Sequence, residues 1–255
     1  GFIGGTATGE TTTLGRGGSD YTATLLGAIL GAGAVEIWTD VNGVMSADPR
    51  IVREAFSLES LNYDELMELS HWGAKVMHPA AVQPARESGI PILIRNTLNR
   101  EFEGTEVREV ASSTRGPVRG IASINDVSLL RLEGTGLQGA PGTAERLFGA
   151  LARERISVIL ITQASSERSI CFAVEPGKVD EAVRVIHKAF ELERAADLVD
   201  DLVVERHCSI LAAVGEAMRE SPGIAGRIFD VLGHHRVNVR AIAQGSSEII
   251  ISLVV

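Results

Sequence analysis

The sequence predicts an α/β region with a largely parallel sheet, followed by a duplicated α+β unit. Two observations support this prediction. Strand-like and helix-like stretches alternate through residues 1–108, which is typical of a sheet covered by helices. Further along, the segment from Pro141 recurs from Pro222 to Val255, an offset of 81 positions. A fixed internal period indicates a repeated structural unit. A polar stretch at residues 109–120 is interpreted as the linker between the two regions.

The first region contains helix and strand signals in alternation. Apolar periodicity predicts a helix over residues 21–31, and a continuous apolar run predicts a buried strand over residues 35–41. Asn42-Gly43 and Asp48-Pro49 then indicate a loop. Two further helices and a strand are expected at residues 63–69, 80–87 and 91–95.

Each copy of the repeat is predicted to run strand, turn, helix, strand, turn, strand. The helix is expected to begin near Pro141-Gly142 and again near Pro222-Gly223, because proline is favoured at the first position of a helix. A second helix is expected at residues 179–190 of the first copy only. We therefore expect one α+β domain over residues 121–202 and another over 203–255 that lacks its closing helix.

Composition narrows the classes of function. A formal charge of −9 argues against a nucleic-acid or anionic-membrane surface, which requires clustered lysine and arginine. The most apolar segment, residues 22–35, is too short and glycine-rich to cross a bilayer. Cys171 and Cys208 lie in apolar runs and are interpreted as core residues of a cytoplasmic protein. Because residue 1 is Gly rather than Met, the chain is expected to begin within a domain.

The segment Thr11–Asp20 is the strongest candidate for chemistry. Its glycines allow close backbone approach, and a helix start favours an anion. Arg16 offers a bidentate fork for a carboxylate or phosphate, and Asp20 is placed to position a metal or a reacting group. The alternative is a plain loop in which Ser19 and Asp20 cap the helix. The segment is neither a Walker A nor a G-x-G-x-x-G loop.

Three further motifs favour a ligand-binding segment over a plain loop. They are Trp38-Thr39-Asp40-Val41-Asn42-Gly43-Val44-Met45, Asp48-Pro49-Arg50, and Gly73-Ala74-Lys75-Val76-Met77-His78-Pro79. Together with Thr11–Asp20, in this order and spacing, they resemble the aspartokinase family. The resemblance covers essentially the whole chain. It implies the C-terminal half of an amino-acid kinase fold followed by two ACT-type domains (βαββαβ-like), closest in pattern to the aspartokinase part of bifunctional aspartokinase–homoserine dehydrogenases.

The resemblance also implies a reaction and a set of roles. The γ-phosphoryl group of Mg-ATP would pass to the side-chain carboxylate of aspartate, the first step towards lysine, threonine, methionine and isoleucine. Arg16 and Asp20 would be the catalytic pair. Substrate would be bound by Phe2, Arg16, Gly17, Gly18 and Ser19. The nucleotide would be bound by Thr39, Asp40, Met45, Arg50, Lys75 and Val76, although relatives commonly have Tyr at the position of Met45. No tightly bound metal or cofactor is expected.

Two further expectations concern the histidines near the predicted site and a lysine-containing segment of the family. His71 and His78 are interpreted as structural, because a carboxylate nucleophile is already ionised at neutral pH and needs no general base. The family's Lys-Phe-Gly-Gly-Thr-Ser segment, which supplies a phosphate-binding lysine, does not occur in these residues. The chain alone is therefore expected to be inactive, unless a partner chain supplies that segment.

The repeated turns are predicted to sense an amino acid. Gln163, Ser165 and Ser166 of the first copy recur as Gln244, Ser246 and Ser247 of the second. Lysine-inhibited relatives carry Asp at the position of Ile159, so threonine is favoured over lysine as the effector. A homodimer through the ACT-type domains is expected. Two alternatives remain: a regulatory amino-acid-binding chain without catalysis, and a module that only dimerises.

Overall fold

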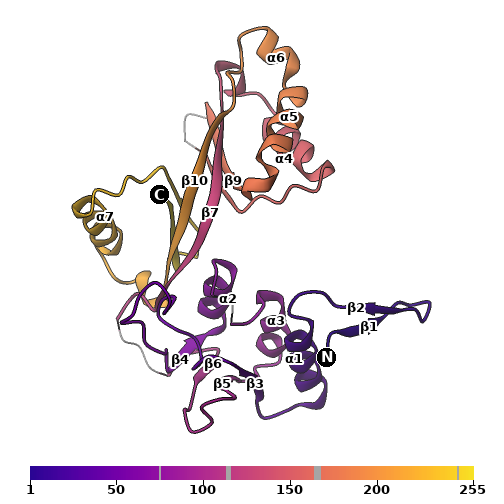
Figure 1. Ribbon diagram of the computed structural model, residues 1–255, viewed down its shortest axis with the longest axis vertical. Helices are drawn as coiled ribbons and strands as arrows, with labels where there is room; N and C mark the ends of the chain where they lie inside the picture. Colours follow the sequence, from indigo (N-terminus) through magenta and orange to yellow (C-terminus); the bar gives the residue numbers. More distant parts are fainter. Residues whose placement is uncertain (75, 113–115, 164–167, 246) are drawn as a thin grey trace. The chain divides into compact units, whose positions relative to one another are not determined.

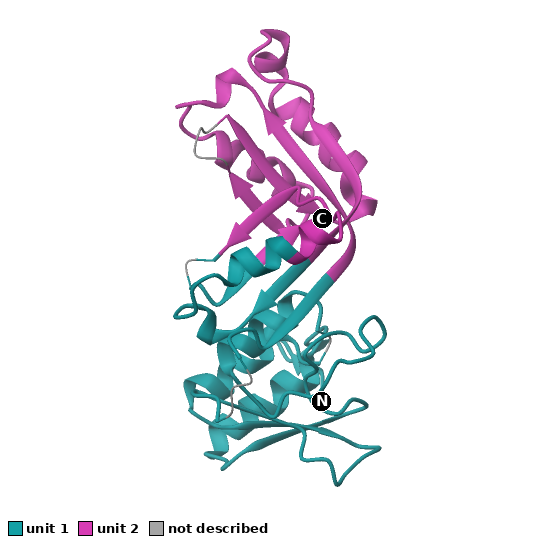
Figure 2. Ribbon diagram, turned by 90° about the vertical axis from the view of Figure 1, so that its left-hand side faces the viewer, with its two compact units in different colours: residues 1–123, 211–230, 245–251 teal, residues 124–210, 231–244, 252–255 magenta. Residues whose placement is uncertain are grey.

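The computed structural model describes residues 1–74, 76–112, 116–163, 168–245 and 247–255. The chain divides into two compact units, shown in Figure 2. The first unit comprises Gly1–Ser123, Leu211–Asp230 and Gly245–Ile251. The second unit comprises Ile124–Ile210, Val231–Gln244 and Ser252–Val255. The domain boundaries expected at residues 108, 121 and 203 stay a prediction.

A four-stranded sheet forms the centre of the first unit, with strand order β3-β5-β6-β4. β3 (Val35–Thr39) pairs in parallel with β5 (Ile92–Asn96), and β4 (Ser60–Asn62) pairs in parallel with β6 (Thr105–Arg108). β5 and β6 are antiparallel. The sheet is therefore largely parallel, as the alternation of strands and helices predicted.

Three helices accompany this sheet, and Figure 1 shows them beside it. They are α1 (Gly18–Leu30), α2 (Tyr63–His71) and α3 (Pro79–Glu87). α1 packs against α3 and approaches β3 closely at Gly27, where an added Cβ would lie 2.4 Å from Val35 Cγ2. A short antiparallel hairpin, β1 (Ile3–Gly5) with β2 (Thr11–Thr13), precedes α1. The expected helices and strands of this region are confirmed, with ends that differ by at most three residues.

The repeat builds a six-stranded sheet with the order β11-β12-β10-β7-β9-β8. The first copy contributes β7 (Gly120–Glu133), β8 (Leu160–Gln163) and β9 (Ser169–Val174), and β9 is antiparallel to both others. The second contributes β10 (Val203–Val214), β11 (Ala241–Gln244) and β12 (Ile250–Val254). The edge strands β8 and β11 meet, since Thr162 Oγ1 donates to the Ile242 carbonyl at 2.9 Å.

The helices of the repeat are α4 (Thr143–Arg153), α5 (Val179–Ala189) and the short α6 (Glu191–Ala195) in the first copy, and α7 (Ile224–His234) in the second. Short 3₁₀ turns are η1 (Thr135–Leu137), η2 (Pro176–Lys178) and η3 (Glu216–Met218). In Figure 1, α4 and α5 lie side by side next to β9, in keeping with their packing contact.

The duplication extends to unusual backbone angles. Gly142 and Gly223 both have φ of 83°, and Asp126 and His207 have φ of 56° and 58°. Asp126 and His207 occupy equivalent positions of the adjacent strands β7 and β10, and their side chains lie 3.2 Å apart. The expectation that the helices begin near Pro141-Gly142 and Pro222-Gly223 is confirmed, but proline does not occupy the first helical position of α4. Gly142 is the N-cap of α4, so Pro141 lies outside the helix, because the glycine supplies the left-handed turn that precedes it.

The core of the first copy is formed by the inner faces of α4 and α5 against β7 and β9. Its fully buried members include Leu130, Leu147, Phe172 and Ile186. Phe148 and Phe172 meet edge to face with ring centroids 6.2 Å apart. Cys208 is buried and Cys171 is half-buried, and both are free thiols, as expected for apolar packing rather than a disulfide.

Replacement of Leu147 by Ala tests this core. Leu147 is fully buried, so Leu147→Ala removes packing atoms and leaves a cavity, and we expect a loss of about 3 kcal/mol in the free energy of unfolding. Leu192 is 82% exposed, and Leu192→Ala should change it by less than ~0.5 kcal/mol. Urea unfolding monitored by circular dichroism measures both. Equal effects of the two changes would contradict the assigned core.

Candidate functional site

An open cleft of about 800 Å³ lies in the first unit where α1, α2 and α3 converge. The loop before α1 and the start of that helix contribute Arg16, Gly17 and Asp20. The end of α2, the following loop and the start of α3 contribute the rest of the lining: Ser70, His71, Ala74, Val76, Met77, His78, Pro79 and Ala80. The cleft therefore combines the strongest sequence motif with the segment around His78.

Two adjacent glycines make this convergence possible. Gly17 has φ of 71° and is the N-cap of α1, and a Cβ built there would lie 2.3 Å from His78 Cβ. A Cβ on Gly18 would lie 2.7 Å from Leu14 Cβ and 3.0 Å from Phe2 Cβ. Any side chain at either position would force these segments apart, so the glycines bring the start of α1 against both Phe2 and α3.

The alternative in which Ser19 and Asp20 cap α1 is wrong. The helix begins at Gly18, and no side chain caps Gly17. Ser19 and Asp20 therefore lie inside the first turn, where Ser19 Oγ and Asp20 Oδ1 are 3.5 Å apart. The Gly18 N–H donates to the Gly15 carbonyl at 3.2 Å, and among the described residues no acceptor meets the backbone N–H groups of Ser19 and Asp20, which can therefore face an anion.

The Asp20 carboxyl is half-buried in the cleft. Burial raises its pKa above the ordinary value of 3.8, while the Ser19 hydroxyl and nearby His78 lower the pKa in part. A carboxylate that is partly desolvated binds cations more strongly than one in open water. Asp20 is thus a candidate ligand for a metal ion that accompanies a phosphate group.

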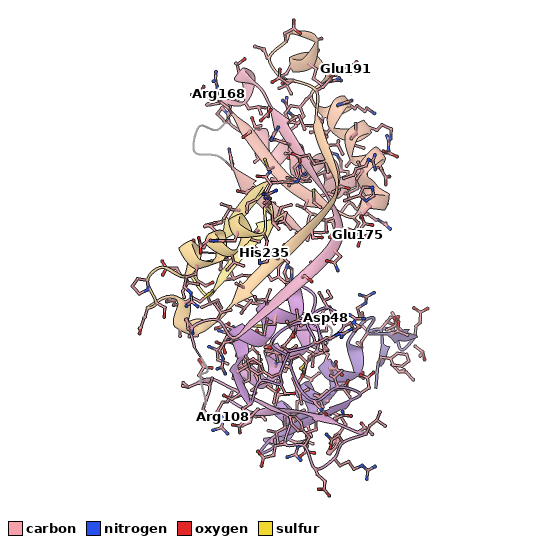
Figure 3. The ribbon with its side chains drawn as sticks, turned by 60° about the vertical axis from the view of Figure 1, so that its left-hand side comes forward. Asp48, Arg108, Arg168, Glu175, Glu191 and His235 are labelled. Atoms are coloured by element: carbon pink, nitrogen blue, oxygen red, sulfur yellow. The ribbon has the colours of Figure 1, made fainter. Side chains whose placement is uncertain are left out.

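Arg16 and Arg50 differ in what they are free to bind. Arg16 is exposed on the cleft, and the described residues offer it no ion-pair partner. Arg50 forms a two-pronged pair with Asp48, labelled in Figure 3, with Arg50 Nε and Nη2 at 3.0 and 2.7 Å from the carboxylate oxygens. Of the two, Arg16 is therefore the cation that is ready to take a ligand anion.

Thr39, Asp40 and Met45, which are also expected to bind nucleotide, lie outside the cleft lining. Thr39 ends β3 and Asp40 follows it, and Thr39 Oγ1 donates to Asp40 Oδ1 at 3.1 Å. The parallel partner of Thr39 is Asn96, whose amide donates to Asn42 Oδ1 at 2.7 Å. Met45 forms a bridge with Ser57. Thr39 and Asp40 thus lie at the carboxyl end of β3, next to the carboxyl end of its parallel partner β5, a common ligand position in open α/β sheets.

The segment after α2 is only partly described. Val76 lines the cleft, and its role in binding nucleotide stays a prediction, whereas Lys75 lies outside the described residues. His78 caps α3, since its Nδ1 accepts from the Ala80 N–H at 3.3 Å. His71 packs edge-on against Trp72. Both histidines therefore have structural contacts, although both also line the cleft.

Ser70 was not singled out from the sequence. Its hydroxyl is buried, lines the cleft and has no hydrogen-bond partner among the described residues. The only signal in the sequence is its place two residues before Trp72 and three before Gly73. A serine near a helix end is too common to be chosen on that ground.

A second pocket, of about 350 Å³, lies in the second unit at the N-terminus of α4. Gln163, at the end of β8, lines it together with the turn before the helix and the first helical residues: Leu137, Gly139, Ala140, Pro141, Gly142, Thr143, Ala144 and Ile170. In the part of the chain that the structure describes, no side chain caps α4. The pocket thus joins the free N–H groups of a helix to one amide side chain.

The corresponding residues of the second copy are less completely described. Gln244 ends β11 and is exposed. Ser247 accepts a hydrogen bond from Arg219 Nε through its carbonyl oxygen. Ser165, Ser166 and Ser246 lie outside the described residues.

Two classes of site receive no support from the part of the chain that the structure describes. Within it, no group of three or more His, Cys, Asp or Glu side chains is placed to hold a metal ion. In the same residues, no helix is long and apolar enough to cross a membrane.

Comparison with family models gives matches in both regions. Residues 1–96 match the amino acid kinase family, and residues 130–190 and 211–255 match the ACT domain. The chain is 44% identical to a bifunctional aspartokinase/homoserine dehydrogenase of Daucus carota, over all of the chain and 28% of the relative. It is 34% identical to aspartokinase 3 of Arabidopsis thaliana, over all of the chain and 45% of the relative. The chain spans less than half the length of these relatives.

Solved structures of aspartate kinases have the same fold. The aspartate kinase of Clostridium acetobutylicum aligns with a TM-score of 0.86 and 32% identity, covering all of this chain and 58% of that one. E. coli aspartokinase III in complex with aspartate and ADP aligns at 0.79 and 33%, covering all of this chain and 56% of that one. Its complex with lysine and aspartate aligns at 0.77 and 34%, covering all of this chain and 55% of that one.

The raised pKa of Asp20 predicts a stability change that depends on pH. A carboxyl whose pKa is raised by folding favours the folded state below its ordinary pKa of 3.8 and loses that contribution as pH rises through the folded-state pKa. Asp20→Asn should therefore increase the free energy of unfolding at pH 7, and this gain should shrink as pH falls towards 3.8. Urea titrations across this range measure it.

The exposed Asp180 provides the control for this experiment, since Asp180→Asn removes a surface carboxylate outside the cleft. A decrease in stability for Asp20→Asn at pH 7 would contradict the cause assigned to the pKa shift.

Proposed function

We propose, because the chain belongs to the aspartokinase family, that the protein is an aspartate kinase under amino-acid control. It would transfer the γ-phosphoryl group of ATP to the side-chain carboxylate of aspartate and form 4-phospho-L-aspartate. The observation that carries this proposal is the cleft in which the start of α1, the Asp20 carboxylate and the Arg16 guanidinium come together, the last without an ion-pair partner among the described residues.

The chemistry of the cleft supports this reaction. Both substrates are anions, and Arg16 with the N–H groups of α1 provides positive charge for a carboxylate or a phosphate. Aspartate needs no general base, because its carboxylate is ionised at neutral pH. Phosphoryl transfer then depends on positioning and on neutralising charge at the phosphoryl oxygens. Positioned cations and backbone N–H groups fit that demand better than a proton-transfer residue does.

The residues divide into three proposed roles. Arg16 would pair with the aspartate carboxylate, with Phe2, Gly17, Gly18 and Ser19 shaping the substrate pocket around it. Asp20 would position the phosphoryl group, and its carboxylate is the hard oxygen ligand that Mg²⁺ prefers. Thr39, Asp40, Met45, Arg50, Lys75 and Val76 would bind the nucleotide, Arg50 after release from Asp48.

Activity of these 255 residues by themselves is a separate question. They contain no Lys-Phe-Gly-Gly-Thr-Ser run, which the family resemblance connects with phosphate binding. We therefore expect no phosphoryl transfer by these residues alone. Turnover of aspartate and ATP by the isolated chain would overturn this expectation.

Arg16→Met tests the aspartate site in a full-length protein. Loss of a hydrogen-bonded charge pair costs about 1.5–3 kcal/mol, so the KM for aspartate should rise by about 10- to 100-fold. The KM for ATP should change little, because Arg16 is assigned to the amino acid. Coupled ADP-release kinetics measure both constants. Arg86→Met is the control, since Arg86 pairs with Asp64 on the surface. A rise confined to the KM for ATP would reassign Arg16 to the nucleotide.

The pocket at α4 supports threonine as the effector. A free amino acid would place its carboxylate at the uncapped helix N-terminus and its polar side chain near the Gln163 amide. None of the described lining residues is acidic, so a lysine ammonium would lack a counter-charge there. We propose that threonine binds this pocket, that Gln244 and the serines of both turns serve the same function, and that ACT-type domains of two chains pair.

A purely regulatory role is the second candidate function. The pocket at Gln163 is lined only by residues of the repeat, so it can bind an amino acid without the kinase cleft. Threonine binding by a full-length protein that never phosphorylates aspartate would favour this candidate. A cytoplasmic location stays a prediction.

Gln163→Ala tests the effector pocket. Removal of the amide eliminates one or two hydrogen bonds worth about 1 kcal/mol each, so threonine affinity should fall by about 5- to 30-fold. Isothermal titration calorimetry with threonine and with lysine measures the affinities. Gln83→Ala is the control, because Gln83 lies outside the pocket and donates to Glu87 on the surface of α3. Unchanged threonine affinity in Gln163→Ala would place the effector elsewhere, and tight lysine binding without threonine binding would reverse the choice of effector.

A further inference from the structure

The N-terminus of α2 contains a buried carboxylate that joins three segments of the first unit. Glu65 is 2% exposed. It completes a capping box with Asn62, whose N–H donates to Glu65 Oε2 at 3.0 Å while the Glu65 N–H donates to Asn62 Oδ1 at 2.7 Å. The other oxygen, Oε1, accepts from the backbone N–H of Glu216 at 2.9 Å. One carboxylate thus holds both the start of α2 and the turn η3 that follows β10.

Arg119 adds a buried positive charge to the same group. Its side chain is 4% exposed, and its Nε lies 3.8 Å from Glu65 Oε1. The guanidinium also donates to the Ser60 carbonyl, and the Arg119 N–H donates to the Val214 carbonyl at 2.7 Å. Arg119 directly precedes β7, so the entry to the first copy of the repeat and the end of β10 are both bonded around α2.

Gly215 permits the close approach of these strands. A Cβ built on Gly215 would lie 2.1 Å from the Pro117 carbonyl oxygen and 3.0 Å from the Arg119 nitrogen. Both neighbours are backbone atoms, which cannot rotate away. The position of η3 relative to residues 117–119 is therefore fixed by the absence of a side chain.

The C-terminal end of α2 is held by β7 as well. Gly73, with φ of 123°, follows α2, and a Cβ there would lie 2.3 Å from the Ser123 carbonyl oxygen. Ser70 and His71 in the last turn of α2, and Ala74 after Gly73, line the cleft. A helix of nine residues that is held at both ends moves as one body, so its two ends are mechanically linked.

We propose that α2 carries the regulatory signal to the cleft, with Glu65, Arg119 and the Glu216 backbone as the positioning residues of the coupling. This inference rests on the proposed function, because it assigns the route of the control suggested there. β7 belongs to the first copy of the repeat and β10 to the second, and each strand has one end close to Glu65. A shift of either strand changes the support of α2 and thereby the position of Ser70 and His71.

The buried charges of Glu65 and Arg119 explain why a shift of β7 or β10 would move α2 instead of breaking its contacts with these strands. Removing a partner from a buried carboxylate leaves a desolvated charge, which is far more costly than losing an exposed pair. The state in which Glu65 keeps both Arg119 and the Glu216 N–H as partners is therefore favoured over states in which one of these contacts is broken. By contrast, the Asp64–Arg86 pair on the same helix is exposed, and its loss should leave the cleft unchanged.

Gly215→Ala tests the coupling without any ligand. The added methyl group displaces η3 from residues 117–119, and amide hydrogen exchange of residues 66–74 should become about 10-fold faster. Gly233→Ala is the matched control, because a Cβ on this glycine of α7 meets nothing within 4 Å. Faster exchange at 216–219 with unchanged exchange at 66–74 would overturn the proposal.

A second variant serves if Gly215→Ala does not fold. Glu216→Ala removes the carboxylate that accepts from Asn62 Nδ2 and should give a smaller increase in amide exchange at residues 66–74. No change in this region would equally overturn the proposal.

A double-mutant cycle separates coupling from general loosening. Glu65→Gln keeps the shape of the side chain but removes its charge, so Gly215→Ala should have little added effect on residues 66–74 in that background, within about two-fold. In Asp64→Asn the effect of Gly215→Ala should persist in full. Equal effects in the Glu65→Gln and Asp64→Asn backgrounds would contradict transmission through Glu65.

The effector experiment distinguishes this inference from the proposed function. Where calorimetry detects threonine binding, saturating threonine should alter exchange at residues 66–74 in the wild-type chain. The alteration should vanish in Glu65→Gln, while threonine affinity stays within about two-fold. Threonine that binds and leaves this region unchanged would overturn the inference but not the effector. Absence of threonine binding would overturn the effector, and the Gly215→Ala result would still decide the inference.

Discussion

The contact between Gly17 and His78 is the constraint on which the candidate site depends. The left-handed turn at Gly17 ends the loop and starts α1, and the missing side chain lets the backbone touch the residue that caps α3. With any larger residue the two helix starts would separate. Arg16 and Asp20, one residue before and three residues after this turn, would then no longer share a cleft with the segment around His78.

Glycines also occupy other positions where segments of the chain approach closely or turn. Gly73 and Gly215 each leave room for a backbone carbonyl group of another segment, and Gly142 and Gly223 shape the turn before the helix in each copy of the repeat. Such positions favour glycine for two physical reasons, positive φ or lack of space. Near Gly215, the charged side chains of Glu65 and Arg119 are buried and paired with each other. The first unit is therefore held by specific polar contacts as well as by apolar packing.

The cleft at Arg16 and the pocket at Gln163 use helix starts in a similar way. Both α1 and α4 begin after a left-handed glycine and have no side-chain cap. The first N–H groups of a helix need hydrogen-bond acceptors from outside the helix. Where no side chain caps them, water or the carboxylate or phosphate of a ligand can accept from them. In one pocket the helix start is joined by a cation and a carboxylate, and in the other by an amide. That difference suits a charged pair of substrates in the first and a small zwitterion in the second.

The sequence by itself determined the order of elements, the duplication and the motif that surrounds Arg16, because periodicity, glycine placement and repeat spacing are local properties of the chain. It misjudged the caps, since Ser19, Asp20 and Pro141 are favoured near helix starts but glycines hold those positions here. The tertiary structure alone decided that Ser70 lines the cleft and that Glu65 meets Arg119 and Glu216. Those contacts join residues whose separation along the chain carries no signal, and only packing brings them together.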